Sequence, residues 1–279
     1  MSADNQHLQL LAAWAAAVQA NLRGGPPQAV RQGLDARVAA SAAAHAGYRT
    51  VRRDASPWLP CGDGARLRWL RQDGGGQVAL VALDDGAALP PLPGAEAVET
   101  LLAEGSLLDL QTGRLLPRFS HAVQPGGPPG TLRAAGPVLL YQRTQLAPLD
   151  QLPEAEARWW QARLAAARAQ PGTGGWQAPG EWVHNRPGVQ VLPLAAKRHV
   201  VSMLVRFEPG AGVPDHGHEI DEDCLVLEGE MFLGDILLRP GDYQLAPAGG
   251  GHFGETSDAG VLFFFHGAVD AALGARTAA

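Results

Sequence analysis

The sequence repeats itself at a constant distance of 124 residues. A shift by this distance aligns the first half with the second, from residue 58 to residue 141, without a gap. The matched positions are mainly glycine, proline and apolar residues. They are Trp58 with Trp182, Gly64 with Gly188, Leu70 with Leu194, Leu80-Val81 with Leu204-Val205, Gly86 with Gly210, Pro90 with Pro214, Leu101 with Leu225, Glu104-Gly105 with Glu228-Gly229, Gly136 with Gly260, and 138–141 with 262–265. A single offset that holds through so many positions indicates that one domain has been duplicated.

Each copy begins with a predicted helix and continues with short apolar segments. Residues 28–46 and 154–170 are rich in alanine, arginine and glutamine, which favour helix, and a further helix is predicted over 4–22. The segments that follow include 200–207, 224–227, 232–238 and 261–265. Gly234-Asp235 suits a tight hairpin inside one of them. Many short strands between regular turns indicate a sandwich or barrel. We expect the helices to pack on the barrels or between subunits, and the second arrangement would make a homodimer.

Composition excludes several classes of function. The formal net charge is −6, Lys197 is the only lysine, and no stretch concentrates basic residues as nucleic-acid-binding surfaces do. Cys61 and Cys224 stand far apart without a CxxC pair, which favours a reducing compartment. The apolar run at 10–14 has no preceding lysine or arginine, and no segment is long enough to span a membrane. We therefore expect a soluble cytoplasmic protein that binds neither nucleic acid nor a membrane.

The second copy contains a group of residues that can bind a metal ion. His216 and His218 alternate along the chain, so in a strand their side chains point to the same side. Glu222 has the same parity and can join them past a short turn, whereas His252 has to come from another strand. Three imidazoles and one carboxylate suit a divalent transition metal. They also leave one or two coordination positions for exogenous ligands, as in catalytic sites.

The spacing of these residues matches two motifs of the cupin superfamily. Residues 210–229 fit the first motif, G-x5-HxH-x3-E-x6-G, at every defined position. Residues 241–252 fit the second, G-x5-PxG-x2-H, although Thr256 stands where that motif usually ends with Asn. Within the cupins, segments 213–218 and 225–229 resemble the C-terminal domain of ChrR-type anti-sigma factors. The resemblance is specific from about residue 200 to residue 267.

The resemblance implies a metal site and a role. In ChrR-type proteins the C-terminal domain binds zinc and takes part in sensing oxidative stress. The family motifs place His216, His218, Glu222 and His252 as the ligands of one divalent metal ion, with zinc as the metal. Through the repeat the resemblance extends to the first half, which makes the chain a bicupin.

We therefore predict a mainly β protein with two tandem cupin barrels of the double-stranded β-helix, or jelly-roll, type and a few N-terminal and linker helices. The predicted domains are N-terminal helices over 1–50, a degenerate barrel without metal ligands over 51–148, a helical linker over 149–175, and a metal-binding barrel over 176–270.

The first barrel is called degenerate because the repeat offset places no ligand in it. His216 corresponds to Leu92, His218 to Gly94, Glu222 to Val98 and His252 to Pro128. None of these side chains can bind a metal. His121 is the nearby histidine, but it corresponds to Leu245 and not to a ligand. We therefore expect one metal per chain, and a first barrel that serves for packing or as an intersubunit surface.

One part of the ChrR pattern is missing. ChrR-type proteins hold a sigma factor with an N-terminal helical domain that has its own zinc site of histidine and cysteine. This chain has His7 and His45 in the corresponding region but no pair of cysteines there. The resemblance suggests a sigma factor as partner, and the missing cysteines argue against one.

Three functions remain open. The first is a sensor or regulatory module in which zinc responds to a small-molecule ligand or an oxidant. The second is a cupin metalloenzyme, such as a non-haem dioxygenase or a lyase, that uses iron, manganese or nickel to act on a small organic substrate. There, Glu222 would serve as a base if it left the metal. The third is a storage or structural bicupin with an incidental metal, which the intact ligand set argues against. A cupin fold alone does not choose among them.

Other residues near the predicted metal have two interpretations each. Cys224 is either a small buried apolar residue or an oxidation-sensitive thiol. Arg206 would bind an anionic ligand or form a surface ion pair. The candidates for the wall of a ligand pocket are Met231, Tyr243, Phe263 and Phe265.

Overall fold

The structure is a computed structural model that describes residues 14, 25–73, 76–91, 95–126, 131–145, 148–169 and 175–269. The chain divides into two compact units, Met1–Ala46 and Gly47–Ala279. In the first unit, helix α2 spans Gln28–Ala44 and follows Pro27, whose extended backbone lies outside the helical region. No residue of α2 is buried, and no described helix is long and apolar enough to cross a membrane. Of the helix predicted over 4–22, only Trp14 lies within the described residues, where it is helical.

The C-terminal barrel of the second unit is an antiparallel structure of many short strands. Their bounds are β1 Arg49–Val51, β12 Val183–Arg186, β13 Val189–Lys197, β14 Val200–Phe207, β15 Ala211–Val213, β16 His216–Gly217, β17 Glu222–Gly229, β18 Met231–Leu233, β19 Ile236–Leu238, β20 Tyr243–Ala246, β21 Gly251–His252, β22 Glu255–Ser257 and β23 Val261–Ala268. The large sheet has the order β1-β20-β17-β23-β14-β13-β12. Two smaller sheets, β15-β22-β18-β19 and β16-β21, enclose with it a core that includes Val205, Val226, Leu238 and Phe263.

The N-terminal barrel has the same plan. Its strands are β2 Leu59–Gly62, β3 Ala65–Gln72, β4 Gly76–Leu83, β5 Ala97–Glu104, β6 Leu107–Asp109, β7 Leu115–Leu116, β8 His121–Pro125, β9 Leu132–Ala134, β10 Val138–Gln145 and β11 Trp176–Gln177. The large sheet has the order β11-β8-β5-β10-β4-β3-β2, and the small one is β7-β6-β9. The core between them includes Val81, Leu102, Leu116, Leu140 and Trp176.

The two strand orders superimpose through the sequence repeat. The 124-residue offset carries β3 onto β13, β4 onto β14, β5 onto β17 and β10 onto β23, and these strands hold the same relative places in their sheets. The predicted hairpin is present too, with Gly234-Asp235 between β18 and β19. The mainly β fold of two tandem barrels with helices is confirmed.

Two short strands are exchanged between the barrels. Strand β1, which precedes the first barrel in sequence, pairs with β20 of the second, whereas β11, which precedes the second barrel, pairs with β8 of the first. Each exchanged strand covers the edge of a large sheet, where unpaired backbone groups would otherwise be open to other chains. The domain boundaries predicted near residues 51 and 176 thus fall at strands that belong to the sheet of the opposite barrel.

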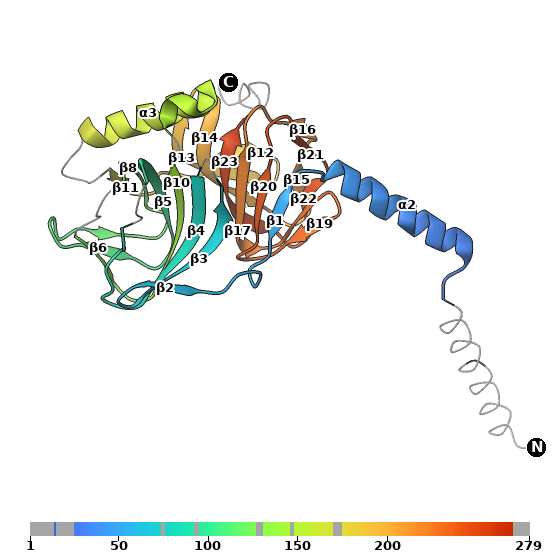
Figure 1. Cartoon of the computed structure of the whole chain (residues 1–279), viewed down its shortest axis with the longest axis horizontal. Coiled ribbons are helices and arrows are strands. Elements are labelled where there is room, and N and C mark those ends of the chain that lie inside the picture. Colours follow the sequence, from blue (N-terminus) through green and yellow to red (C-terminus); the bar gives the residue numbers. More distant parts are fainter. Residues whose placement is uncertain are drawn as a thin grey trace, which may run out of the picture. The chain divides into compact units, whose positions relative to one another are not determined.

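Helix α3 spans Glu154–Ala169, as predicted for 154–170, and links the barrels (Figure 1). It packs on β8 of the first sheet and on β13 and β14 of the second. Its buried residues are Ala157, Trp159, Trp160 and Leu164, which lie along one side of the helix. The large sheets also share an apolar cluster, in which Leu80, Leu101 and Tyr141 meet Leu204, Leu225 and Phe264. The rings of Tyr141 and Phe264 lie 4.5 Å apart between their centroids.

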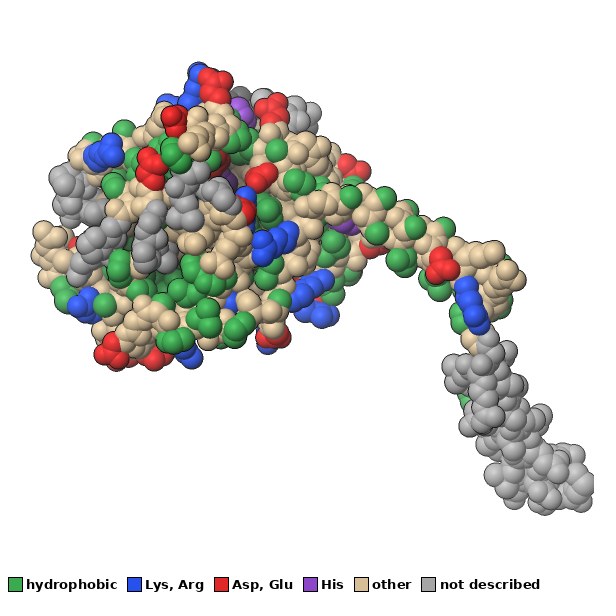
Figure 2. Space-filling view, in the orientation of Figure 1, with side chains coloured by type: hydrophobic (Ala, Val, Ile, Leu, Met, Phe, Trp, Pro, Cys, Tyr) green, Lys and Arg blue, Asp and Glu red, His purple; other side chains and the backbone are tan. Residues whose placement is uncertain are grey.

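Charged side chains on the second unit are dispersed. On the face seen in Figure 2, lysine and arginine side chains alternate with aspartate and glutamate among many apolar ones, and no patch gathers one sign of charge over the described part of that face. Arg206, one of the candidates for binding an anion, stacks on Trp182 with 4.2 Å between its guanidinium carbon and the ring centroid. That contact is a cation–π interaction, and the two predicted roles of Arg206 stay predictions.

Candidate metal centre

Two short paired strands bring two of the predicted ligands side by side. His216 in β16 stands directly opposite His252 in β21, so both imidazoles project from the same face of the ladder. Their ring centroids are 5.5 Å apart, and that of His218 is 5.2 Å from His252. A side chain at Gly251 would place its Cβ 2.6 Å from the carbonyl oxygen of His216. Glycine is therefore required for the two strands to approach this closely.

Glu222 completes the group from a different element. It is the first residue of β17 and is 3% exposed. Its Oε1 accepts a hydrogen bond from Nε2 of His252 at 2.8 Å. One potential ligand atom from each of His218, Glu222 and His252 lies within 4.8 Å of the other two. Among the described residues, this is the one group of three or more histidine, cysteine, aspartate and glutamate side chains that meets such a limit.

His216 lies at the edge of this group and is half-buried. Its Nδ1 donates a hydrogen bond to the carbonyl oxygen of Pro214 at 3.0 Å. A proton on Nδ1 leaves Nε2 with a free lone pair, which is the usual arrangement of a metal-binding histidine. The structure thus gathers His218, Glu222 and His252 tightly and places His216 beside them with one ring nitrogen available.

The buried polar atoms of the group lack protein partners. Neither ring nitrogen of His218 has a hydrogen bond of normal geometry, although the side chain is only 4% exposed and the backbone of Ile220 is near it, and Oε2 of Glu222 also has no partner. Burying such atoms without a partner costs roughly 1–3 kcal/mol each. A divalent cation would satisfy them, because lone pairs on imidazole nitrogen and carboxylate oxygen are the donors that such ions take. The residues present therefore fit a metal ion.

Electrostatics in the group favour a cation. Burial raises the pKa of Glu222 to about 7, although His218 and His216 act in the opposite direction. Burial lowers the pKa of His218, so its neutral, metal-binding form is preferred. A bound cation would stabilise the Glu222 carboxylate and the neutral imidazole together.

Of the four positions in the first barrel that correspond to the candidate ligands, one lies within the described residues. Val98, which corresponds to Glu222, lies in β5 and pairs with Gln124 of β8. Leu92, Gly94 and Pro128 lie outside the described residues. His121 is 4% exposed, and its Nε2 is 2.8 Å from Oε1 of Glu99. The ring of His121 therefore belongs to a network of polar contacts between the barrels.

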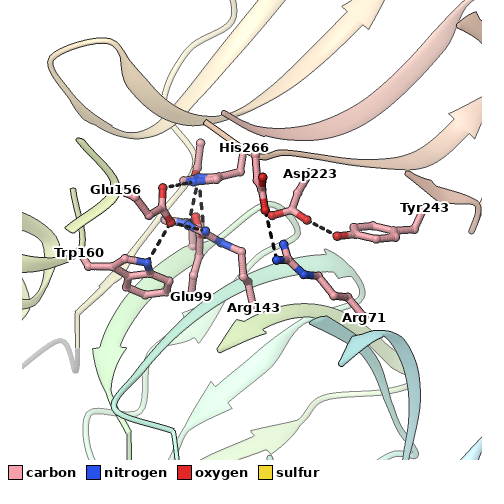
Figure 3. Close-up of polar contacts among 11 residues, drawn as sticks. Arg71, Glu99, Arg143, Glu156, Trp160, Asp223, Tyr243 and His266 are labelled. Atoms are coloured by element: carbon pink, nitrogen blue, oxygen red, sulfur yellow. Dashed lines mark hydrogen bonds and ion pairs between the residues drawn. The ribbon is translucent and has the colours of Figure 1, made fainter. Parts of the chain in front are cut away.

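That network includes Glu99, Arg143, Glu156 and His266, and Figure 3 shows Asp223 and Tyr243 beside them. Asp223 follows Glu222 and points the opposite way, where it accepts a hydrogen bond from the hydroxyl of Tyr243. Across the ladder, Asp223 stands opposite His266 in β23. Arg71 of the first barrel reaches Asp221 at 3.2 Å.

Arg143 is the centre of the network. It donates to Glu99 of its own barrel at 2.9 Å, to Glu156 of α3 at 2.6 Å and to Nδ1 of His266 at 3.1 Å. Burial alone would raise the pKa of both carboxyl groups, but the Arg143 guanidinium holds the pKa of each well below its usual range. Nε2 of His266 donates to the second oxygen of Glu156 at 3.1 Å. Three parts of the molecule are thus joined at one buried cation.

Residues that sequence reasoning missed surround the site. The hydroxyl of Tyr48 donates to the carbonyl oxygen of Gly251 at 2.6 Å and accepts from its N–H at 2.8 Å, which ties β21 to the start of the second unit. Glu255 is 7% exposed and makes no hydrogen bond with another described residue. No position of either motif marks Glu255. Tyr48 carried no signal, because it lies 203 residues from its partner.

Of the four expected residues of the pocket wall, two line the cavity and two, Met231 and Tyr243, do not. Phe263 and Phe265 line a cavity beside the site, and Met231 lies in the core of the same barrel. Tyr243 belongs to the apolar cluster between the two sheets, because it stands opposite Leu225, which faces that cluster. Cys224 is 4% exposed in the barrel core, and burial raises the pKa of its thiol well above the usual value.

Comparison with known proteins agrees with this geometry. Residues 177–270 match the family model described as the ChrR cupin-like domain. The C-terminal region is a ChrR cupin-like domain. No curated protein matches the chain in sequence.

Solved structures extend the likeness to both barrels. A putative glyoxylate-induced protein from Pseudomonas aeruginosa is 14% identical, with a TM-score of 0.51 over 80% of this chain and 89% of that one. Oxalate decarboxylase from Bacillus subtilis is 18% identical, with a TM-score of 0.51 over 79% and 76%. A putative dioxygenase from Nostoc punctiforme is 14% identical, with a TM-score of 0.53 over 78% and 81%. At these identities the likeness shows a shared bicupin fold.

Proposed function

We propose that this chain is a divalent-metal-binding bicupin that acts as a ChrR-like sensor or regulatory protein. Its C-terminal barrel would hold one metal ion, with zinc as the resident metal, through His216, His218, Glu222 and His252. The observation that carries the proposal is the buried His218, whose two ring nitrogens have no partner, beside Glu222 and His252. The match of this region to the ChrR cupin-like domain supports the regulatory role.

The protein's own groups prepare the site. The carbonyl oxygen of Pro214 fixes the proton of His216 on Nδ1 and so leaves Nε2 free to bind a metal. Gly267 packs closely against the Glu222 side chain. A Cβ atom at position 267 would lie only 3.1 Å from Cγ of Glu222. A bound zinc ion would supply Lewis acidity toward a small molecule or an oxidant that reaches it. We propose such a molecule as the signal, and a pull-down with sigma factors tests whether one of them is the regulatory partner.

Elemental analysis tests the metal site. Protein purified without added metal should contain one zinc ion per chain. We expect His218→Ala and His252→Ala to lose the metal, whereas Val98→Ala, at the position in the first barrel that corresponds to Glu222, should keep it. An unchanged metal content in both histidine variants would refute the site.

The second candidate is a cupin metalloenzyme, such as a non-haem dioxygenase that acts on a small organic substrate. A cavity of about 300 Å³ with largely apolar walls and His216 in its lining favours it, because a substrate could lie next to the metal. Oxygen uptake with diketone and phenolic compounds tests this function. If the metal is zinc and no compound consumes oxygen, the dioxygenase is excluded. If iron is bound and turnover is observed, the sensor is excluded.

A further inference from the structure

The cavity beside the metal centre has mostly apolar walls with a few polar side chains, one of which is Ser202 of β14. Its walls come from the inner faces of β13, β14 and β23, and include Val191, Val201 and Phe263. Polar side chains occur where His216 and Glu255 line it and at Asn185 and Arg186 of β12. Its volume of about 300 Å³ is at the small end of the range of ligand pockets, roughly 300–1,000 Å³. A rigid molecule of one or two rings is therefore the size that fits.

Glu255 is the unusual group in this lining. It stands opposite Val213 in the β15–β22 ladder and is 7% exposed, yet its carboxyl group makes no hydrogen bond with another described residue. Burial raises the pKa of Glu255 to about 7, whereas the attraction of His252 lowers it. Glu255 lines the cavity, so a ligand that brings a donor could give its carboxyl group a hydrogen-bond partner that the described residues do not supply.

The charged residues near Glu255 restrict which kind of donor group the ligand can carry. An anionic ligand at this position would meet the like charge of the ionised Glu255 carboxyl group. A cationic ligand would meet Arg186, whose positive charge acts on Glu255. A neutral hydroxyl group avoids both penalties. Phe263 and Phe265 offer flat apolar surfaces for an aromatic or alicyclic body.

We propose that this cavity binds a small, neutral, largely apolar ring compound that carries one hydroxyl group. The hydroxyl group donates a hydrogen bond to Glu255, and its oxygen lies at the end of the cavity lined by His216. This inference rests on the proposed function, since it gives the ligand class of the same barrel. Glu255 acts in it as a specificity-determining residue and is separate from the four metal ligands.

Three naphthalene derivatives test the inference on the full chain. 2-Naphthol carries the donor, 2-methoxynaphthalene has nearly the same shape without it, and 2-naphthoate is an anion. Fluorescence titration of metal-loaded protein should show saturable binding of 2-naphthol that is at least tenfold tighter than binding of the other two. We expect the same order of affinities in metal-free protein, because Glu255 and the apolar walls do not depend on the metal.

Variants assign the preference to Glu255. Glu255→Leu should bind 2-naphthol and 2-methoxynaphthalene within about twofold of each other, whereas Glu255→Gln, which keeps an acceptor oxygen, should retain part of the preference. Val201→Phe should abolish binding of both by filling the cavity. The exposed Glu208→Ala is the matched control and should behave as wild type. All four proteins should keep the wild-type metal content, which shows that the barrel is folded.

Two results would overturn the inference. One is tighter or equal binding of 2-methoxynaphthalene by the wild-type protein, or no saturable binding of 2-naphthol. The other is an unchanged preference in Glu255→Leu. Failure of the proposed function would be seen in a different measurement. Wild-type protein would then lack stoichiometric metal, whether or not it binds 2-naphthol.

Discussion

At the scale of single residues, burial does not distinguish a metal ligand from a structural histidine. His121, His218 and His266 are each at most 4% exposed. Nε2 of His121 pairs with Glu99, and both nitrogens of His266 have partners, on Ser202 and Glu156. His218 has none for either nitrogen. The missing partner, and not the burial, is what identifies His218 as a candidate ligand.

Glu99 provides a prediction on acid stability. Its pKa in the folded protein is held below the ordinary value of 4.5, chiefly because Arg143 outweighs the opposing effect of burial. A lowered pKa means that the ionised group stabilises the fold above pH 4.5 and that this stabilisation is lost as pH falls toward the folded value. We expect Glu99→Gln to reduce the free energy of unfolding at pH 7 by about 3 kcal/mol, since it leaves a buried cation short of a partner.

Urea denaturation at pH 7 and pH 4 measures this effect. Glu99→Gln should lose less stability between the two pH values than wild type, while Glu104→Gln, at an exposed position of the same strand, should match wild type. An equal loss in Glu99→Gln and wild type would show that Glu99 does not contribute.

At the scale of elements, the candidate ligands come from different places: His216 and His252 from two-residue strands, His218 from the segment after β16, and Glu222 from the start of β17. The sequence predicted which residues they are, because the two motifs are local patterns. The alternation argument held only in part, since β16 ends at Gly217 and Glu222 starts a separate strand. The direct pairing of His216 with His252 and the support from Tyr48 are contacts between distant segments, which local spacing does not encode. Glu255 was missed because no motif position marks it.

The close approach of β16 and β21 gives a second prediction. Gly251→Ala would place a Cβ 2.6 Å from the carbonyl oxygen of His216 and force the two strands apart. We expect metal affinity to fall by roughly 10–100-fold, as it does when groups that orient ligands are disturbed. Gly217→Ala is the matched control, because its Cβ meets nothing closer than 3.4 Å. Competition with a chelating dye measures both. Equal affinities for the two variants would contradict the need for close approach.

At the scale of the whole molecule, the first barrel works as a structural partner of the second. The exchanged strands β1 and β11, the apolar cluster between the sheets and the contacts of Arg143 all cross between the barrels. The repeat predicted two barrels of one design, and the structure confirms them. The exchange was not predicted, because the repeat offset says which segments are equivalent and not which barrel each completes.

This sharing predicts cooperative unfolding of the two barrels. We expect calorimetry of the full chain to show one transition for both barrels, because neither barrel keeps its edge strand and its buried partners without the other. Removal of the metal with a chelator should lower the Tm of that whole transition. Two transitions, of which only one responds to the chelator, would contradict a shared structure.

The central claim is one metal ion in the C-terminal barrel, and anomalous diffraction at the metal's absorption edge tests it most directly. The predicted map has a single peak per chain, about 2.0–2.2 Å from a nitrogen of His216, His218 and His252 and from an oxygen of Glu222. A map without a peak at these four side chains, or with one in the first barrel, would contradict the claim.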